Sequence, residues 1–294
     1  MGETTSDPYT RDAVAAMRAR PGFRAAVEAS ARGVLGLYLS VDDELRWVLR
    51  DRGCYFIGVA LVMLHHQGQL TAANLKTAVT SVLREASNGR VRAFLQRMTA
   101  SNHLVPALNT RGKPSRTLMP SAKFFETFQT HRRAVGAAVV LVDPALLDLH
   151  DAMAGTGYPA VEAILTLLAA ERPDVFADAP GDGVFYFFSR EAGFTLLFDL
   201  LLSQPAARTH LLEGTSVSVY GLAKRHGVSR VHVLRLLDDS EKEGWLTFDR
   251  EARTVRFAEK FSERFERHCA MHFLLHQEAA RRYRASPTAH ADTQ

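Results

Sequence analysis

Between residues 217 and 244 the apolar positions recur at the spacing of an α-helix, with one interruption. Residues 217–225 predict a short helix, and His226-Gly227 supplies the turn that follows it. A second helix is predicted to begin after Ser229, because a serine hydroxyl accepts hydrogen bonds from the unpaired amides of the first helical turn. Gly244 ends this helix. The apolar positions that turn one of its faces inward are Val233, Leu236 and Leu237.

The pattern changes from helix to strand after Gly244. Segments 245–248 and 254–257 favour two β-strands, and the polar residues 249–253 between them are typical of a hairpin turn. A long helix is expected from about residue 258 to 284. The predicted order of elements is therefore helix, turn, helix, hairpin and long helix.

The chain contains an internal repeat of this order. Residues 123–131 and 260–268 share the pattern K-F-x-E-x-F-x-x-H. Upstream positions also correspond at one constant offset, Ser87 to Ser229, Val91 to Val233, Leu95 to Leu237 and Leu104 to Leu246. This offset is slightly larger than the offset between the two shared patterns. The difference places a short insertion in the first copy, in a stretch where added residues cost little.

The repeat assigns elements to the more divergent first copy. In chain order these are helices 75–85 and 88–102, strands 104–108 and 116–119, and a long helix over 121–142. We expect two domains, residues 1–142 and 143–294, each carrying one repeat. The predicted fold class is mainly α with small β-hairpins.

The string from Leu222 to Leu246, L-A-K-R-H-G-V-S-R-V-H-V-L-R-L-L-D-D-S-E-K-E-G-W-L, resembles the DNA-binding core of bacterial GntR- and MarR-type regulators. The usual form there is close to L-A-x-x-x-G-V-S-R-x-T-V-x-R-x-L-x-x-L-E-x-x-G-W-L, from which this chain departs at His232 and Ser240. The resemblance implies two winged helix-turn-helix repeats with flanking helices in a pseudo-two-fold arrangement. It also implies a sequence-specific regulator of transcription that binds double-stranded DNA, more often a repressor than an activator.

In such proteins the second helix of each unit enters the major groove, and the hairpin, or wing, follows the backbone or the minor groove. For the first copy the implied DNA-binding residues are Ser87, Asn88, Arg90, Arg92, Arg111, Lys113 and Arg116. For the second copy they are Lys224, Arg225, Ser229, Arg230, His232, Arg250 and Arg253. Arginine can read guanine and asparagine can read adenine, whereas serine suits phosphate. Because Arg230 corresponds to Asn88, the expected site is an imperfect palindrome or asymmetric, with half-sites about one helical turn apart.

Two other functions fit the same pattern. Plasmid-type replication initiators and partition proteins also carry tandem winged helices in one chain. A winged-helix module that binds proteins instead of DNA is the other alternative, and Asp249 and Glu251 favour it because they offset Arg250 and Arg253 in the second wing.

Composition and charge exclude several classes of protein. The 294 residues are 47% hydrophobic and 23% charged, which excludes a chain that is disordered throughout, and the two cysteines exclude a disulfide scaffold. The net charge of +4 permits a nucleic-acid partner without requiring one. No apolar run reaches the roughly 20 residues of a membrane span, and no signal peptide is apparent. We therefore expect a cytoplasmic, nucleoid-associated protein that acts as a single-chain pseudo-dimer or dimerises again.

Other candidate chemistry is weaker. His268, His272 and His276 fall on one face of the last helix beside Cys269, but we expect packing there instead of a metal site. No motif for an enzyme or a cofactor is present, so we expect neither. The aromatic stretch 184–188 is predicted to be core or the contact between the two halves, or else to line a ligand pocket. A small-molecule effector is possible for such regulators, and the sequence names none.

Overall fold

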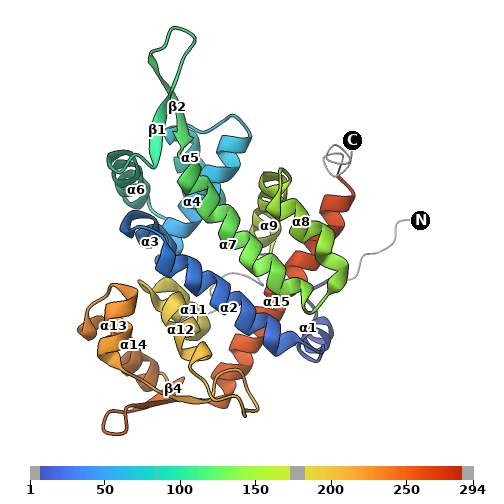
Figure 1. Ribbon diagram of the computed structural model, residues 1–294, viewed down its shortest axis with the longest axis vertical. Helices are drawn as coiled ribbons and strands as arrows, with labels where there is room; N and C mark the ends of the chain where they lie inside the picture. The colour runs from blue at the N-terminus through green and yellow to red at the C-terminus, as the bar shows by residue number, and fades with distance from the viewer. Residues whose placement is uncertain (1–6, 84, 173–182, 287–294) are drawn as a thin grey trace.

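A computed structural model describes residues 7–83, 85–172 and 183–286 of the chain. Within these residues the fold is mainly helical with small antiparallel sheets, as predicted (Figure 1). The first half contains α1 (Arg11–Arg18), α2 (Phe23–Ser40), α3 (Asp43–Leu49), α4 (Arg52–His66), α5 (Ala72–Thr77), the π-helix η1 (Ala78–Leu83), α6 (Asn88–Ala100), β1 (Leu104–Leu108), β2 (Pro114–Pro120) and α7 (Ala122–Val140). The second half contains the 3-10 helix η2 (Pro144–Leu146), α8 (Leu147–Ala154), α9 (Tyr158–Glu171), α11 (Gly183–Ser189), α12 (Gly193–Leu202), β3 (Gly214–Ser216), α13 (Val219–His226), α14 (Arg230–Lys242), β4 (Leu246–Asp249), β5 (Thr254–Phe257) and α15 (Glu259–Arg284).

Serine caps fix the starts of the two helices that the repeat aligns. The hydroxyl of Ser87 accepts a hydrogen bond from the backbone N–H of Arg90 at 3.3 Å, and that of Ser229 accepts one from His232 at 3.0 Å. Gly227, with φ of +65°, forms the turn before Ser229 in a left-handed conformation that suits glycine. Both predicted helix starts are confirmed.

The two sheets differ in size. β1 and β2 form an antiparallel pair in which Leu104 lies opposite Pro120. β4 and β5 form the second predicted hairpin, and β3 adds a third strand on the outer side of β5, with Thr215 opposite Val255. The sequence analysis missed β3. It also predicted one helix over residues 75–85, where the structure has α5 followed by the π-helix η1.

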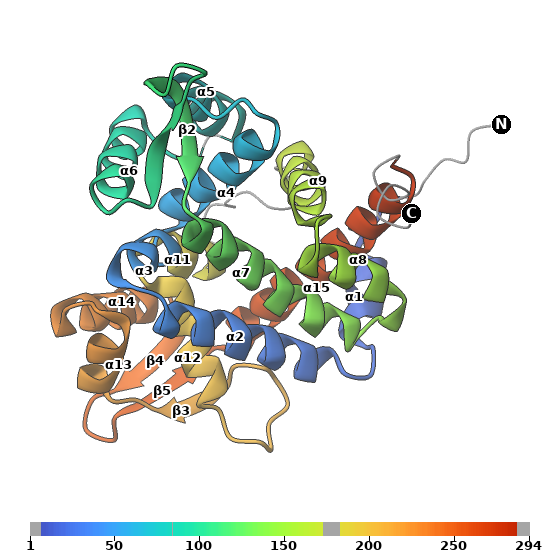
Figure 2. The same cartoon turned by 45° about the horizontal axis from the view of Figure 1, so that its top comes forward.

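The hydrophobic core forms two clusters that do not divide at residue 142. One contains buried residues between 41 and 128 together with Tyr158, and is the interior of the α3–α7 region. The other joins residues 9–34 of the N-terminus to residues 139–283. Helix α2 therefore packs against both α7 and α12, and both helices lie beside it in Figure 2. The two predicted domains stay a prediction, and the packing shows that residues 1–142 and 143–294 share a core.

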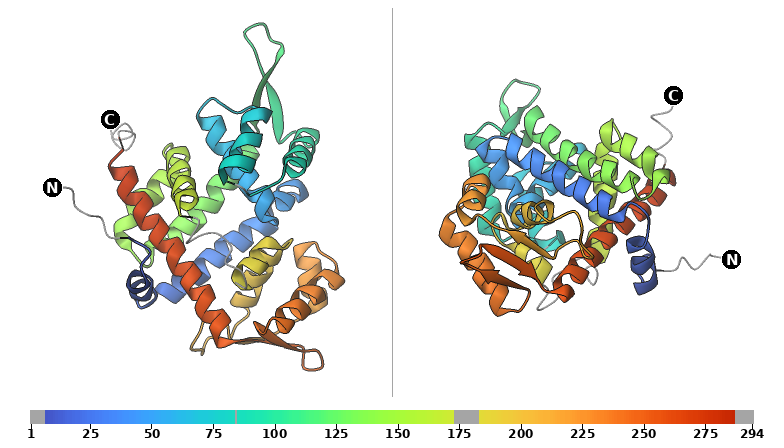
Figure 3. Two further views of the ribbon diagram at one scale, coloured as in Figure 1. Left: turned by 180° about the vertical axis from the view of Figure 1, so that it is seen from behind. Right: turned by 60° about the horizontal axis from the view of Figure 1, so that its bottom comes forward.

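Helix α15 runs the length of the second cluster. In Figure 3 it passes along the back of the molecule from the β4–β5 hairpin to the region of α8 and α9. It packs against α1, α9 and α11, so that it contacts segments from both halves of the chain. Its bounds lie within one residue of those predicted.

Gly58 allows α4 and α7 to approach closely, and its replacement by alanine is expected to destabilise the protein. A Cβ atom there would lie 2.1 Å from Cζ of Phe128, a buried ring that stacks on both Tyr55 and Phe124. Overpacking of this kind costs about 1–3 kcal/mol, which outweighs the gain of up to about 1 kcal/mol from helix propensity.

Chemical denaturation of Gly58→Ala measures this loss. Gly36→Ala in α2 is the matched control, because a Cβ atom at Gly36 meets nothing within 4 Å. The control is expected to be neutral or stabilised by up to about 1 kcal/mol. Equal stability of the two variants would contradict the close approach.

Candidate nucleic-acid interface and central cavity

The second copy of the repeat places an exposed helix start in front of a small sheet. Helix α13 is capped by Ser218 and ends at the Gly227 turn, and α14 follows after Ser229. Val233, Leu236 and Leu237 are buried, as predicted, so the opposite face of α14 is exposed. At its first residue, the guanidinium of Arg230 lies 5.5 Å from the ring centroid of Tyr220 on α13. We call α13 to β5 the second unit.

The first copy has the same order from α5 to β2, which we call the first unit. Ser87, Asn88, Arg90 and Arg92 lie on the exposed start of α6. The β1–β2 hairpin projects from the body of the protein (Figure 1). In its turn, the side-chain oxygen of Asn109 accepts hydrogen bonds from the backbone N–H groups of Arg111 and Lys113 at 2.9 and 3.1 Å. These bonds shape a turn with exposed cationic side chains.

The segment between α3 and α4 joins the starts of α6 and α14. Arg50 donates a hydrogen bond to the carbonyl oxygen of Gly227, 3.3 Å away, in the turn before α14. The carboxylate of Asp51 lies 3.3 Å from the guanidinium of Arg90 in the first turn of α6. The two helix starts therefore flank this segment on one face, at the left of Figure 1, and the two hairpins lie at opposite ends of the molecule.

The arginines, lysines and histidine among the predicted DNA-binding residues fall into two groups. One group is exposed and forms no ion pair with any described residue, and it contains Arg92, Arg111, Lys113, Arg116, Lys224, Arg230 and Arg253. The other group has intramolecular partners. Arg90 pairs with Asp51, Arg250 pairs with Asp238, and Nε2 of His232 donates to the carbonyl of Glu191 at 2.8 Å. The first group is the one available to a partner without breaking an ion pair.

Arg225 belongs to the second group, and its partner is buried. The carboxylate oxygens of Asp199 lie 2.5 and 2.6 Å from the same guanidinium nitrogen of Arg225, and 2.9 Å separates one of them from Nε2 of His226. Asp199 is 4% exposed and His226 is fully buried. This contact ties the end of α13 to α12 and so fixes the position of the turn before α14.

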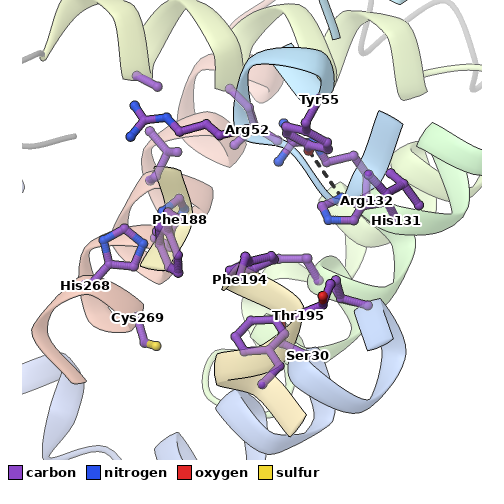
Figure 4. Close-up of a pocket in the computed structure, with 18 of the residues that line it drawn as sticks. Ser30, Arg52, Tyr55, His131, Arg132, Phe188, Phe194, Thr195, His268 and Cys269 are labelled. Carbon is purple, nitrogen blue, oxygen red and sulfur yellow. Dashed lines mark hydrogen bonds between the residues drawn. The ribbon is translucent and has the colours of Figure 1, made fainter. Parts of the chain in front are cut away.

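A cavity of about 230 Å³ lies in the middle of the protein, between helices of both halves (Figure 4). Its wall comes from α2, α4, α7, α9, α11, α12 and α15 and is largely aromatic and aliphatic. Phe185 and Phe188 of the aromatic stretch form part of it, whereas Val184 and Phe187 are buried in the core, as the first interpretation of that stretch predicted. Tyr38 and Arg50 also line it, and they hold the carbonyl oxygens of His226 and Gly227 before α14.

Four histidines line this cavity, His131 on α7 and His268, His272 and His276 on α15. Burial lowers the pKa of His131 and of His268 to about 3, and that of His276 to about 4. The pKa of His272 is also held well below its usual value by burial, with neighbouring histidines adding to the effect. All four are therefore neutral at pH 7.

Two arginines of the wall already hold carboxylates. Arg132 forms a two-pronged ion pair with Glu162 of α9, at 2.6 and 2.7 Å, and the side chain of Glu162 is fully buried. Arg52 forms a similar pair with Glu85, at 3.0 and 2.8 Å, just before α6. Their positive charges are thus compensated inside the protein. Among the described residues, no cluster of histidine, cysteine or acidic side chains has the geometry of a metal site.

No known family, curated protein or solved structure matches this chain. Among the described residues, no single helix is long and apolar enough to span a membrane. The neighbouring segments η2–α8 and α9 meet these two criteria only when they are taken together, and they are bent by 117° relative to each other.

Sequence reasoning missed Arg132, Glu162 and Asp199. A signal existed for Asp199 and Glu162, because each is a carboxylate within a strongly apolar helix and such a residue needs a buried partner. Nothing in the sequence indicated which residue would be the buried partner of each carboxylate. Arg132 follows the repeated histidine pattern, where the second copy has Cys269, so the repeat gave no reason to single it out.

Proposed function

We propose that the protein binds double-stranded DNA sequence-specifically through the starts of α6 and α14, as a regulator of transcription. The observation that carries the proposal is the pairing of two units with the same order of elements, each with a serine-capped and exposed second helix, on one face of the molecule. The units are proposed to be winged helix-turn-helix repeats related by a pseudo-two-fold axis.

The charges at this face suit phosphate and bases. Arg92 and Arg230 lie near the starts of the two helices, where the backbone amides add a partial positive charge. Neither side chain has a carboxylate partner among the described residues, so neither must break an ion pair to reach DNA. The hairpins would add backbone contacts through Arg111, Lys113 and Arg116 at one end and Arg253 at the other. One chain carries both units, so one chain per site is expected.

The protein-binding alternative also has an observation in its favour. Arg90 and Arg250 hold carboxylates of the protein itself, which reduces the charge that each unit presents. The DNA proposal therefore rests on the unpaired arginines, and these are the residues to change.

Selection of bound duplexes from a random library, followed by affinity measurements over a range of salt concentrations, tests the proposal. The variant is Arg92→Ala/Arg230→Ala. We expect the wild type to enrich a two-part motif and the variant to bind it about 10- to 100-fold more weakly for each arginine that reads a base. A lost phosphate contact would instead lower the slope of log affinity against log salt by about one.

Arg11→Ala/Arg133→Ala is the matched control, because it removes the same charge from exposed arginines on α1 and α7. The control should bind within about threefold of the wild type, as expected for charges outside the interface. Equal affinities of the two double variants, or no enrichment by the wild type, would reject DNA binding and favour the protein-interaction module. A motif that clusters at a replication origin instead of at promoters would identify an initiator.

A further inference from the structure

We propose that the half-site bound by the second unit contains a thymine, and that the 5-methyl group of this base packs against the side chain of Val231. The inference rests on the proposed function, to which it adds one base that α14 reads.

Val231 lies on the outer face of α14, at the start of the helix. It is the second residue of α14 and comes a little more than half a turn before the buried Val233, so the two side chains leave the helix on opposite sides. Leu236 and Leu237, one turn after Val233, are buried with it. The side chain of Val231 is therefore directed away from the core, and the residue is 63% exposed.

The residues on either side of Val231 are held by other contacts. The guanidinium of Arg230 lies over the ring of Tyr220 on α13, and Nε2 of His232 donates a hydrogen bond to the carbonyl of Glu191 between α11 and α12. These contacts draw the two neighbouring side chains toward the flanking segments. Val231 is thus the side chain that stands foremost at the start of α14.

The same face of α14 suits an anionic partner. Arg235 follows Val231 by one turn on this face, is exposed and forms no ion pair with any described residue. Asp238, one turn further, is paired with Arg250, so its negative charge is compensated. An apolar side chain beside a free cation matches the major groove, where the methyl group of thymine lies between two phosphate backbones.

The chemistry of valine selects thymine among the bases. Thymine alone presents a methyl group in the major groove, and apolar side chains contact that group there. Valine has no hydrogen-bonding group in its side chain, so it gains nothing from the donors and acceptors of the other bases. Helix propensity gives no other reason for a valine at this position, because alanine and most charged residues form helices better.

The first unit lacks this contact. In the repeat, Val231 corresponds to Gly89 and Arg235 corresponds to Ala93. A Cβ atom at Gly89 would meet only the hydroxyl oxygen of Ser87, at 3.9 Å, so the fold leaves room for a side chain that the sequence does not provide. The thymine contact is therefore expected in one half-site only, which makes the whole site asymmetric.

Replacement of each thymine of the selected duplex by uracil, one at a time, tests the inference. Uracil keeps the hydrogen-bonding groups of thymine and lacks only its methyl group. We expect the wild type to bind about fourfold more weakly when uracil replaces one thymine of one half-site, as the loss of one buried carbon predicts.

Two variants of the full-length protein assign this effect to a residue. Val231→Ala should reduce the difference between thymine and uracil at that position to less than twofold, because the shorter side chain does not reach the methyl group. Leu147→Ala is the matched control, since it shortens a leucine of α8 that is 53% exposed, and it should keep the fourfold difference. Thermal unfolding shows whether both variants are folded, as expected for exposed positions.

The outcomes separate this inference from the proposed function. If the wild type enriches a motif but loses no affinity with uracil at any thymine, or if the loss persists in Val231→Ala, the contact of Val231 is wrong and DNA binding stands. If the wild type enriches no duplex, DNA binding is rejected and this inference falls with it.

Discussion

Lowering the pH from 7 to 5 is expected to destabilise the protein strongly, because protonation of the cavity histidines favours the unfolded chain over the folded state. Burial holds the pKa of His131 and His268 at about 3 and that of His276 at about 4, whereas an unfolded histidine titrates near 6.5. Between these values the unfolded chain binds more protons than the folded one. Stability is therefore complete above about pH 6.5 and falls as the pH approaches the folded pKa values.

The size of this effect is comparable to the stability of a whole domain. Each of these three histidines costs about 1.4 kcal/mol per pH unit below 6.5, so about 2 kcal/mol each at pH 5. Their sum of about 6 kcal/mol compares with a typical total of about 5–15 kcal/mol. Burial raises the pKa values of Asp42, Asp143 and Asp148, but their hydrogen bonds and nearby positive charges together outweigh it and lower them, so these carboxylates stay ionised over this range.

Urea denaturation at pH 7, 6 and 5 measures the loss. His268→Leu should flatten the dependence on pH, because it removes one of the titrating groups. His66→Gln, which replaces an exposed histidine at the end of α4, should leave the dependence as in the wild type. The same free energy of unfolding at pH 7 and at pH 5 would contradict neutral histidines in the cavity wall.

Glu162→Gln is expected to destabilise the protein by about 3–5 kcal/mol, because it leaves the guanidinium of Arg132 without a countercharge. The pair bridges α7 and α9, and both of its hydrogen bonds are shorter than 2.8 Å. Glutamine keeps the shape and one acceptor but removes the negative charge. The side chain of Arg132 is only 14% exposed, so little water can reach its guanidinium to replace the lost negative charge.

Chemical denaturation at pH 7 measures the loss of stability in Glu162→Gln. A variant that breaks an exposed ion pair serves as the comparison. Asp148→Asn breaks the pair with Arg284, whose side chains are 49% and 48% exposed, and should cost no more than about 1 kcal/mol. Replacing both buried partners, as Glu162→Leu/Arg132→Leu, should recover much of the loss, since apolar residues can fill the space of a buried ion pair. A cost for Glu162→Gln as small as that for Asp148→Asn would show that water reaches Arg132.

The candidate interface and the cavity meet at the turn before α14. Tyr38 donates a hydrogen bond to the carbonyl of His226 at 2.8 Å, and Arg50 donates to that of Gly227. Both side chains also line the cavity, so the interior and the exposed helix start share the same few residues. Asp199 holds the end of α13 from the other side. The position of α14 is thus set by contacts from α2, α3 and α12, outside the second unit.

The sequence by itself determined the local elements of this protein. Helical periodicity, the serine caps at residues 87 and 229 and the glycine turn at 227 act over a few neighbouring residues, so they can be predicted without knowing the fold. The alternation of apolar and polar residues in the second hairpin can also be predicted without knowing the fold. The same holds for the internal repeat, which located the first hairpin. The exposed helix starts and their serine caps therefore followed from the sequence, and so did the burial of Val184, Phe185 and Phe187.

Only the tertiary structure decided how distant residues meet. The strand β3 is three residues, Gly214–Ser216, with no pattern of its own, and it exists because β5 offers an edge to pair with. The shared core, the pairs Arg132–Glu162 and Arg225–Asp199, and the carboxylates that hold Arg90 and Arg250 join residues that lie from 12 to more than 100 positions apart. Side chains so far apart in sequence are brought together by the packing of helices, because local backbone preferences contain no information about which distant carboxylate a buried arginine will find.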